Sequence, residues 1–392
     1  MKIVSVMTTS SPGGAEFAAL EMLEALRARG HETVMLSDQP GIGRDTGVDV
    51  RPIDIGPKLS QRSWGRLLIR SPQLVARLRS ELADVAPYDV LLLHYKKEQI
   101  LALALPRRLT RTLVWAEWGP VPFPLRRGVP LALYRLAARR AALVMAVSAG
   151  TRDSVCDLGV PRHKVHVVPN VMRTDAIRFT GEGRERVRGR LQIQDGAFVV
   201  GCISRFHPKK RNDVVVDAAA RVADAHLVLA GEGETEPALR IRAAELGERA
   251  HFISTPGSDV DAVLSAFDVL VFCPSPTEGA PRAVILGMLA SLPCVATGAE
   301  GVADMITPEF GAICTPENDA RALAAVLERY ASDPDLRVRH GAAARNRAEQ
   351  VYSGAAVAEQ IERLFASAVM SRSKRPERVT LRESDRSATK AD

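Results

Sequence analysis

The sequence is poor in aromatic residues, and it has no long apolar run. Phe, Trp and Tyr make up only 5% of the 392 residues. No RNA- or DNA-binding signature accompanies them, so nucleic acid is not an expected partner. No stretch approaches the roughly 20 apolar residues that a membrane-spanning helix needs, and the sequence predicts no membrane span.

The sequence also lacks paired cysteines and a signal peptide. Its five cysteines are widely spaced, with no Cys-x-x-Cys pair and no histidine at zinc-finger spacing. This pattern excludes a small disulfide-stapled or zinc-dependent domain and predicts reduced core thiols. The amino terminus, MKIVSVM, enters an apolar stretch without the features of a secretory signal. We therefore expect a cytoplasmic protein. The cysteines are Cys156, Cys202, Cys273, Cys294 and Cys314.

Length and composition indicate a globular protein of two domains. The chain is about twice as long as a typical single domain. It is 46% hydrophobic and 25% charged, and its mean hydropathy is −0.03. These values lie far from those of disordered or fibrous proteins.

The net charge of +7 is unevenly distributed along the chain. Residues 1–175 hold 25 Lys and Arg against 16 Asp and Glu, a net +9, whereas residues 176–370 carry −5 and residues 371–392 carry +3. A basic first half suits an anionic acceptor or peripheral contact with an anionic membrane at the inner face of the cell membrane. A solvated basic surface without a partner is the alternative.

Short apolar or β-branched runs alternate with longer amphipathic segments, which is typical of βα units around parallel sheets. The cycle runs twice, with a polar, charged segment at 173–196 between the two rounds. We predict an α/β protein with two doubly wound domains and a ligand-binding cleft between them. The predicted strands are Lys2–Met7, Thr33–Ser37, Val48–Pro52, Val90–Leu93, Thr112–Ala116, Leu143–Val147, Val165–Pro169, Phe198–Ser204, His226–Ala230, His251–Ile253, Val269–Cys273, Pro293–Thr297 and Ala312–Cys314.

We place the first domain at residues 1–172 and the second at residues 173–350. A last helix, at 351–370, follows a break at Ser353-Gly354. Residues 371–392 have almost no large apolar side chain, so we expect a disordered tail there.

Three loops hold candidate site residues. Gly13 and Gly14 join the first strand to a helix, and such a turn lets the backbone approach an anionic ligand at a helix N-terminus. Arg205 lies just past a strand, with Lys210 in the same loop, where cations suit a diphosphate. A plain strand-to-helix connector and a solvated basic turn are the respective alternatives.

The third loop follows the buried run VLVFC and contains Glu278 and Gly279 before a helix. A carboxylate at this place can accept hydrogen bonds from sugar hydroxyls. An ordinary solvated acid is the alternative.

The three loops lie in order within the longer segments AVSAGTRDSVCDLGVPRHKVHVVPNV, LVLAGEGE and DVLVFCPSPTEGAPRAVILGMLASLPCVATGAEGVADMI. Together they closely resemble the retaining glycosyltransferases of family 4, also described as group 1, which have the GT-B fold. The resemblance runs from about residue 1 to 368. It implies transfer of a sugar from a nucleotide sugar, a UDP-sugar by default, to a carbohydrate or lipid-linked acceptor with retention of anomeric configuration. It also implies no cofactor and no required metal, with the acceptor on the N-terminal domain and the donor on the C-terminal domain.

Carried over by position, Gly13 and Gly14 match the family's glycine loop near the donor diphosphate. Arg205 and Lys210 match its phosphate ligands, and Glu278 matches the first acid of its Glu-x7-Glu motif, which contacts the donor sugar. Gly279 directly follows that acid. The last helix is expected to cross back onto the N-terminal domain, as in family members.

Two positions depart from the family pattern. Leu286 stands where the family usually has a second Glu that binds ribose hydroxyls, and Leu cannot accept hydrogen bonds. Trp118 stands where many members have a histidine near the sugar and acceptor, and indole cannot act as a base. Neighbouring Glu117 or the strand-end His94 are candidates to compensate on the acceptor side, although a buried structural role is the alternative for His94.

These observations lead to two hypotheses. The first is an active glycosyltransferase in the biosynthesis of a bacterial glycan, glycolipid or natural product. The second is a protein that keeps the fold but acts as a weakly active carbohydrate-binding or partner subunit. A dinucleotide-dependent enzyme is disfavoured, because GEG at 231–233 lacks the third glycine of the Rossmann fingerprint.

Overall fold

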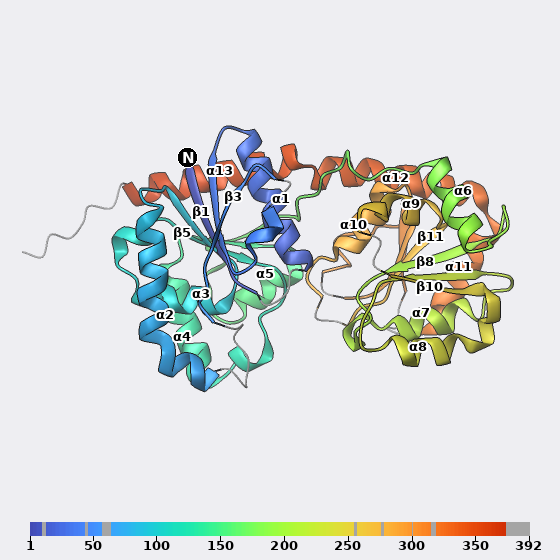
Figure 1. Cartoon of the computed structure of the whole chain (residues 1–392), viewed down its shortest axis with the longest axis horizontal. Helices are drawn as coiled ribbons and strands as arrows, with labels where there is room; N and C mark the ends of the chain where they lie inside the picture. The colour runs from blue at the N-terminus through green and yellow to red at the C-terminus, as the bar shows by residue number, and fades with distance from the viewer. Residues whose placement is uncertain are drawn as a thin grey trace, which may run out of the picture.

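The computed structural model describes residues 1–9, 13–43, 46–56, 64–254, 257–275, 278–299, 301–314 and 319–373. Within these residues the chain forms two parallel α/β units that lie side by side (Figure 1). One unit is built on a seven-stranded sheet in the order β3-β2-β1-β4-β5-β6-β7. The other is built on a six-stranded sheet in the order β10-β9-β8-β11-β12-β13. Each order reverses beside the unit's first strand, as in doubly wound folds, which confirms the predicted fold class.

All thirteen predicted strands are present, with ends that shift by up to two residues. The described strands are β1 Lys2–Met7, β2 Glu32–Ser37, β3 Asp49–Pro52, β4 Val90–Leu93, β5 Leu113–Glu117, β6 Leu143–Ala146, β7 Val165–Val167, β8 Val199–Ile203, β9 His226–Ala230, β10 Ala250–Ile253, β11 Val269–Phe272, β12 Cys294–Thr297 and β13 Gly311–Cys314.

Helices cover both faces of each sheet, as right-handed crossovers between parallel strands require. The described α-helices are α1 Gly14–Ala28, α2 Trp64–Asp84, α3 Lys96–Leu101, α4 Gly128–Arg140, α5 Ala149–Cys156, α6 Gly181–Arg190, α7 Asn212–Ala219, α8 Glu236–Arg242, α9 Val260–Ser265, α10 Arg282–Leu289, α11 Ala320–Ser332, α12 Pro334–Tyr352 and α13 Gly354–Ser373. Short 3₁₀ helices include η4 Phe123–Leu125 and η6 Pro208–Lys210.

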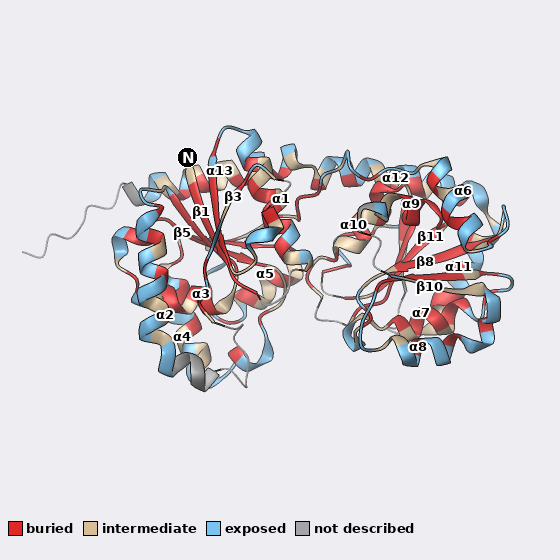
Figure 2. Cartoon of the chain, in the orientation of Figure 1, coloured by how far each residue is buried: buried red, intermediate tan, exposed pale blue. Residues whose placement is uncertain are grey.

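The inner strands of each sheet are buried on both faces, whereas the edge strands β3 and β10 are partly exposed (Figure 2). In the first unit, Trp115 of β5 and Tyr134 of α4 are fully buried, and their ring centroids lie 5.5 Å apart. Large apolar side chains buried in this way provide most of the free energy that stabilises each unit, at roughly 25 cal/mol per Å² of apolar surface.

The polar segment at 173–196 contains α6, which packs against α9. An ion-pair network fixes this end of the second unit. Asp268 accepts hydrogen bonds from Arg184 and Arg188 at 2.8 Å each, and from the backbone N–H of Val199 at 2.7 Å. Arg188 is almost fully buried, and its ion pair with Asp268 offsets the free-energy cost of removing the guanidinium charge from water.

The last helix, α13, runs back from the second unit across the first (Figure 1). Its side chains Val357, Ile361 and Phe365 are buried in the same cluster as Leu23 and Leu26 of α1. Ser353 is extended (φ −63°, ψ 145°) and separates α12 from α13, at the break that the sequence predicts.

The chain passes between the two units twice, and the two passages lie next to each other. The backbone N–H of Met172 donates to the carbonyl of Tyr352 at 2.9 Å, and Met172 forms an isolated parallel bridge with Ser353.

One prediction about the C-terminus is wrong in detail. Helix α13 continues to Ser373, so residues 371–373 are helical and not part of a disordered tail. The rest of the predicted tail, 374–392, lies outside the described residues.

Four of the five cysteines have described side chains, and these four are thiols that form no disulfide bond. Cys202, Cys273 and Cys294 are buried, as predicted, whereas Cys156 is half-buried. Burial raises the pKa of Cys202 to about 12, so this thiol is inert at neutral pH. The side chain of Cys314 lies outside the described residues. Among the helices of the described ranges, none has the length and apolar character needed to cross a bilayer.

Candidate active site

The two units meet where loops at the carboxyl ends of their strands approach each other. A Cβ added to Gly279 would lie 2.2 Å from the carbonyl oxygen of Trp118, and one added to Gly301 would lie 1.1 Å from the carbonyl oxygen of Gly279. Only glycine fits at both places. The side-chain amide of Asn170 donates to the carbonyl of Ala280 at 2.8 Å and holds the same loop.

Lys210 and Glu278, which are 68 positions apart in the sequence, form an ion pair. Nζ of Lys210 lies 2.8 Å from Oε2 of Glu278, and both side chains are about one-fifth to one-quarter exposed. The ammonium group also lies 5.1 Å from the centre of the Phe272 ring. The backbone N–H of Ser275 donates to the carbonyl of Lys209 at 2.8 Å and ties the two loops together.

Arg205 is exposed in the same loop as Lys210, directly after β8. Its neighbour Phe206 is buried, and the Phe206 backbone N–H donates to the carbonyl of Glu232 at 2.8 Å. Phe206 therefore anchors the loop in the core and leaves the Arg205 guanidinium free to face solvent.

The GEG segment, residues 231–233, packs against the backbone of this loop. Gly231 and Gly233 have φ angles of 151° and 153°. Added Cβ atoms would lie 1.9 Å from the carbonyl oxygen of Ser204 and 2.3 Å from that of Phe206. The two glycines are thus needed for close backbone packing beneath the cationic loop.

Gly13 caps α1, and its backbone N–H donates to Oε2 of Glu16 at 2.9 Å. A Cβ on Gly14 would lie 3.3 Å from Cδ of Arg282, the first residue of α10. Arg282 forms a bidentate ion pair with Glu21 of α1, with N–O distances of 2.7 and 2.9 Å. The structure therefore brings the glycine turn to the start of α10, four residues after Glu278.

Leu286 lies one turn after Arg282 on α10. It is half-buried and packs against the hydrophobic core of the second unit. The side chain therefore offers an apolar surface where the family pattern has a ribose-binding carboxylate.

His94 is buried at the end of β4, between Ser5 and Trp118. The indole N–H of Trp118 donates to Nδ1 of His94 at 3.1 Å, and Nε2 of His94 lies 2.7 Å from Oγ of Ser5. Burial lowers the pKa of His94 to about 3, so the ring is neutral at physiological pH. Because Nδ1 accepts, the proton sits on Nε2 and is donated to Ser5. Both ring nitrogens are thus engaged inside the protein.

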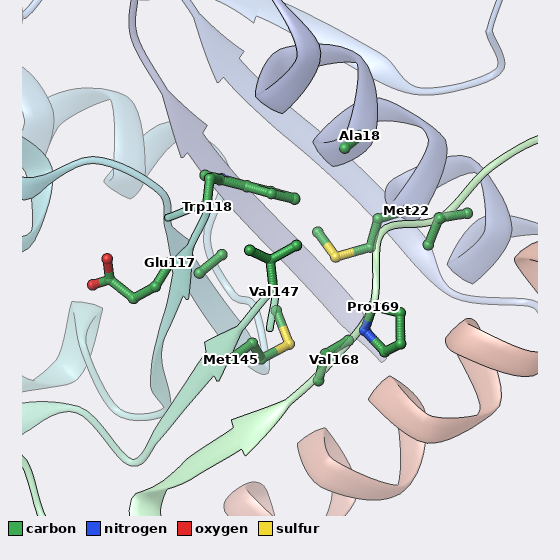
Figure 3. Close-up of a pocket in the computed structure, with 10 residues that line it drawn as sticks. Ala18, Met22, Glu117, Trp118, Met145, Val147, Val168 and Pro169 are labelled. Atoms are coloured by element: carbon green, nitrogen blue, oxygen red, sulfur yellow. The ribbon is translucent and has the colours of Figure 1, made fainter. Parts of the chain in front are cut away.

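Glu117, at the end of β5, is also buried. It forms an ion pair with Lys96 and accepts a hydrogen bond from the amide of Gln99 at 3.1 Å. Burial lowers the pKa of Lys96, while the Glu117 carboxylate opposes that shift. The carboxylate points to the opposite side of β5 from the ring of Trp118 (Figure 3).

Of the three acceptor-side candidates, Trp118 alone is partly exposed. Its ring stacks on that of His94, with the centroids 5.7 Å apart and an angle of 11° between the planes. It also lies over a small cavity of about 20 Å³, whose lining includes Met22, Met145 and Val147 (Figure 3). This cavity has room for little more than one water molecule and does not hold a sugar.

Three residues near the site were not singled out by the sequence. Arg282 and Glu21 join α10 to α1, and the Asp304 carboxylate accepts from the backbone N–H of Ala149 at 3.0 Å across the two units. Their sequence signals are weak because each looks like an ordinary surface charge. The part of the chain that the structure describes holds no group of three His, Cys, Asp or Glu side chains arranged to bind a metal ion.

Two family models match the chain. Residues 183–347 match "Glycosyl transferases group 1", and residues 12–176 match "Glycosyltransferase Family 4".

Curated relatives include two mannosyltransferases. One is a GDP-mannose-dependent monoacylated alpha-(1-6)-phosphatidylinositol monomannoside mannosyltransferase from Corynebacterium glutamicum, 27% identical over 208 residues, or 49% of this chain and 54% of that protein. The other is a GDP-mannose-dependent alpha-mannosyltransferase from Mycobacterium tuberculosis, 27% identical over 322 residues, or 77% of this chain and 80% of that protein. The chain thus matches only about half the length of the first relative.

Solved structures share the whole architecture. Anabaena Alr3699/HepE in complex with UDP superposes with a TM-score of 0.80 at 21% identity, over 94% of this chain and 100% of that chain. Sucrose-phosphate synthase from Thermosynechococcus elongatus superposes with a TM-score of 0.77 at 17% identity, over 94% of this chain and 99% of that chain.

Two doubly wound parallel α/β units that meet at the carboxyl ends of their strands are the architecture of the GT-B class of glycosyltransferases. With both halves matched by the family models, the chain belongs to the group 1, family 4 glycosyltransferases.

Proposed function

We propose that this protein transfers a sugar from a nucleotide-sugar donor, a UDP-sugar in the first instance, to an acceptor with retention of anomeric configuration. The observation that carries the proposal is the 2.8 Å contact between Lys210 and Glu278. It brings a phosphate-binding cation and a sugar-binding acid together at the carboxyl ends of β8 and β11, with Arg205 beside them.

In the proposed mechanism, Arg205 and Lys210 bind the donor diphosphate and stabilise the charge that develops on it as the glycosidic bond breaks. Glu278 accepts hydrogen bonds from hydroxyls of the donor sugar. Because Lys210 pairs with Glu278 in the free protein, donor binding replaces part of that ion pair with phosphate and hydroxyl contacts. The backbone at Gly13 and Gly14 approaches the same diphosphate from the first unit.

This scheme assigns charge neutralisation to two side-chain cations, so we propose that transfer requires no metal ion. Trp118 offers no base, and the ring nitrogens of His94 are occupied. We therefore propose that the leaving phosphate, and not a side chain, assists the acceptor hydroxyl in the retaining step.

The test starts with calorimetric titration of UDP, GDP, ADP, TDP and their common sugar conjugates into wild type and Lys210→Ala. Saturable binding of one nucleotide sugar to wild type, and weaker binding of the same nucleotide sugar to the variant, is the expected result. The anomeric configuration of the product is then read by NMR, in the presence and absence of EDTA. Inversion of configuration, or activity abolished by EDTA, would overturn the corresponding part of the mechanism.

The donor and acceptor classes follow from the relatives as proposals. Two relatives are described as GDP-mannose-dependent, and a structural neighbour was solved with UDP, so UDP-glucose and GDP-mannose are the first donors to test. One of these relatives acts on a phosphatidylinositol mannoside, which supports a glycolipid or lipid-linked acceptor in bacterial glycan biosynthesis.

We further propose that the protein works in the cytoplasm, in peripheral contact with an anionic membrane. Residues 64–140 hold 14 Lys and Arg against five Asp and Glu. Exposed Phe123 on η4 and exposed Val129 and Leu136 on α4 accompany exposed Arg127, which caps the N-terminus of α4. Binding to vesicles of phosphatidylglycerol that weakens in 0.5 M salt supports this contact, and binding that salt leaves unchanged argues against an electrostatic mechanism.

The second candidate function is a weakly active carbohydrate-binding or partner subunit. Leu286 favours it, because an apolar side chain cannot bind ribose hydroxyls. No binding of any nucleotide sugar, together with unchanged cellular function of Lys210→Ala, would favour this alternative over the enzyme.

A further inference from the structure

The helix after β4 buries four consecutive polar side chains. They follow His94 and Tyr95 in the sequence HYKKEQ. Lys97, Glu98 and Gln99 are at most 3% exposed, and the side chain of Lys96 is 11% exposed. Lys and Glu are rarely buried unless they are paired, so this cluster needs a structural or functional reason. We refer to Lys96–Gln99 as the α3 cluster.

The α3 cluster reaches the carboxyl ends of three other strands. Lys96 pairs with Glu117 at the end of β5, and Lys97 donates to the carbonyl of Gly56, which follows β3. Glu98 turns toward β1. Its Oε1 accepts from the backbone N–H of Thr8 at 2.9 Å and from the Thr8 hydroxyl at 2.7 Å.

Residues on both sides of the Gly13-Gly14 turn contact α3 or its capping residue. Thr8, five positions before Gly13, is bound by Glu98. Glu16 lies just after the turn and is bound by the hydroxyl of Tyr95, the residue that caps α3. Oε2 of Glu98 also accepts from the backbone N–H of Tyr95 at 2.5 Å. One carboxylate therefore fixes both the Thr8 backbone and the residue that contacts Glu16.

We propose that Glu98 is a positioning residue, whose ionised carboxylate holds the Gly13-Gly14 turn where it meets the donor diphosphate and so makes donor binding pH-dependent. This inference rests on the proposed function, because it assumes that the turn contacts a nucleotide sugar. It adds a residue that does not itself touch the donor.

The charge state of Glu98 supports a response near neutral pH. Burial raises the pKa of Glu98 to about 7, against the opposing effects of Lys97 and of the hydrogen bonds from Thr8 and Tyr95. The other titratable groups nearby are Glu16 and Tyr95, and burial together with Glu16 raises the pKa of Tyr95. Lys96, two positions before Glu98, pairs with Glu117 at the end of β5.

The direction of the pH effect follows from the hydrogen-bond donors around Glu98. Three protein groups donate hydrogen bonds to the carboxylate, and the ionised form can accept all three. A protonated carboxyl places its own O–H among these donors and loses one acceptor. The affinity for the nucleotide sugar is therefore highest above pH 7 and falls as the pH decreases to 6. The diphosphate of a sugar nucleotide stays fully ionised over this range, so the ligand does not cause the change.

The experiment measures affinity for UDP-glucose and GDP-mannose by calorimetry at pH 6, 7 and 8. In wild type we expect about a tenfold loss of affinity between pH 8 and pH 6 for the nucleotide sugar that binds. Glu98→Gln is isosteric and does not titrate, so its affinity is weak and independent of pH. Tyr95→Phe keeps the carboxylate but removes the contact with Glu16, and it should weaken binding severalfold while keeping the pH dependence. Glu359→Gln, on the exposed face of α13, is the control and behaves as wild type.

A second readout does not depend on a ligand. Hydrogen exchange compares protection factors of the amides of Thr8, Thr9 and residues 13–16 at pH 6 and pH 8. Lower protection at pH 6 in wild type, and low protection at both pH values in Glu98→Gln, support the inference. Equal affinities, equal pH profiles and equal protection in wild type and Glu98→Gln would overturn it. If neither nucleotide sugar binds wild type, the donor proposal fails, and hydrogen exchange alone decides whether Glu98 holds the loop.

Discussion

The guanidinium of Arg282 binds the carboxylate of Glu21 in bidentate fashion, although 261 positions separate the two residues. Arg282 begins α10 in the second unit, and Glu21 lies on α1 in the first. Because Gly14 lies against the Arg282 side chain, this ion pair connects the two units next to the candidate donor site.

The Arg282–Glu21 pair should contribute measurably to stability. Both side chains are less than one-fifth exposed, so the pair is screened less than a surface pair. We expect a coupling energy of about 1–2 kcal/mol in a double-mutant cycle with Arg282→Ala and Glu21→Ala, measured by urea unfolding. The exposed Arg363–Glu359 pair on α13 is the control, and its coupling should stay near 0.3–0.5 kcal/mol, roughly the value for helix pairs. Equal coupling in the two cycles would contradict this expectation.

Loss of the Lys210 ammonium should affect the rate more than the stability. Lys210→Ala removes a cation that stabilises charge on the leaving diphosphate, and we expect kcat to fall by about 10²- to 10³-fold. The melting temperature should change little, because the ion pair is partly exposed. Arg221→Ala, which removes an exposed cation elsewhere on the same unit, serves as the control. A Lys210→Ala variant with wild-type kcat would refute the assigned role.

Restoring a carboxylate on α10 should strengthen nucleotide binding. Leu286→Glu places an acceptor one turn after Arg282, where the family pattern has its ribose-binding acid. We expect about a tenfold gain in affinity for a nucleotide sugar in calorimetry, because a hydrogen bond to a charged group is worth roughly 1.5–3 kcal/mol. Leu286→Met, which adds no acceptor, should leave affinity unchanged. The same affinity in both variants would show that ribose is not bound at this position.

His94 should make the protein sensitive to acid. Its ordinary pKa is 6.5, and burial lowers this to about 3 in the folded protein. The unfolded chain therefore takes up a proton first, and the free energy of unfolding falls as pH drops from 6.5 toward 3. The slope from this one residue is at most about 1.4 kcal/mol per pH unit. His94→Gln cannot titrate, so its unfolding free energy should fall less steeply between pH 6.5 and 4.5 than that of wild type. His163→Gln, at an exposed position, should keep the wild-type slope.

The sheets could be predicted from the sequence because their signals are local. Runs such as VLLL at β4 and VLVF at β11 are continuous and β-branched or apolar, and such runs are typical of parallel strands buried on both faces. Errors occurred at strand ends, where pairing with a neighbour decides the last residue. β7 ends at Val167, two residues before the predicted Pro169, which has no N–H to donate to a partner strand.

The surroundings of the candidate site could not be predicted in the same way. The resemblance assigns Lys210 and Glu278 to one donor, and the structure places them 2.8 Å apart because they follow the neighbouring strands β8 and β11. The partner of Trp118, however, is His94 on another strand, and composition gives no sign of that contact. Lys97 and Glu98 look like solvated helix residues in the sequence. They are buried because α3, which follows β4, packs against the ends of β1, β3 and β5.

The return of α13 to the first unit makes the second unit an insertion within the first. Strand β1 and helix α13, from opposite ends of the chain, belong to one core, so a fragment that stops after β7 lacks part of its own hydrophobic interior. The inserted unit is joined by two adjacent passages of chain, at Met172 and at Ser353. Because two separate segments of chain connect the units, cleavage of the backbone at either one alone leaves the second unit covalently joined to part of the first.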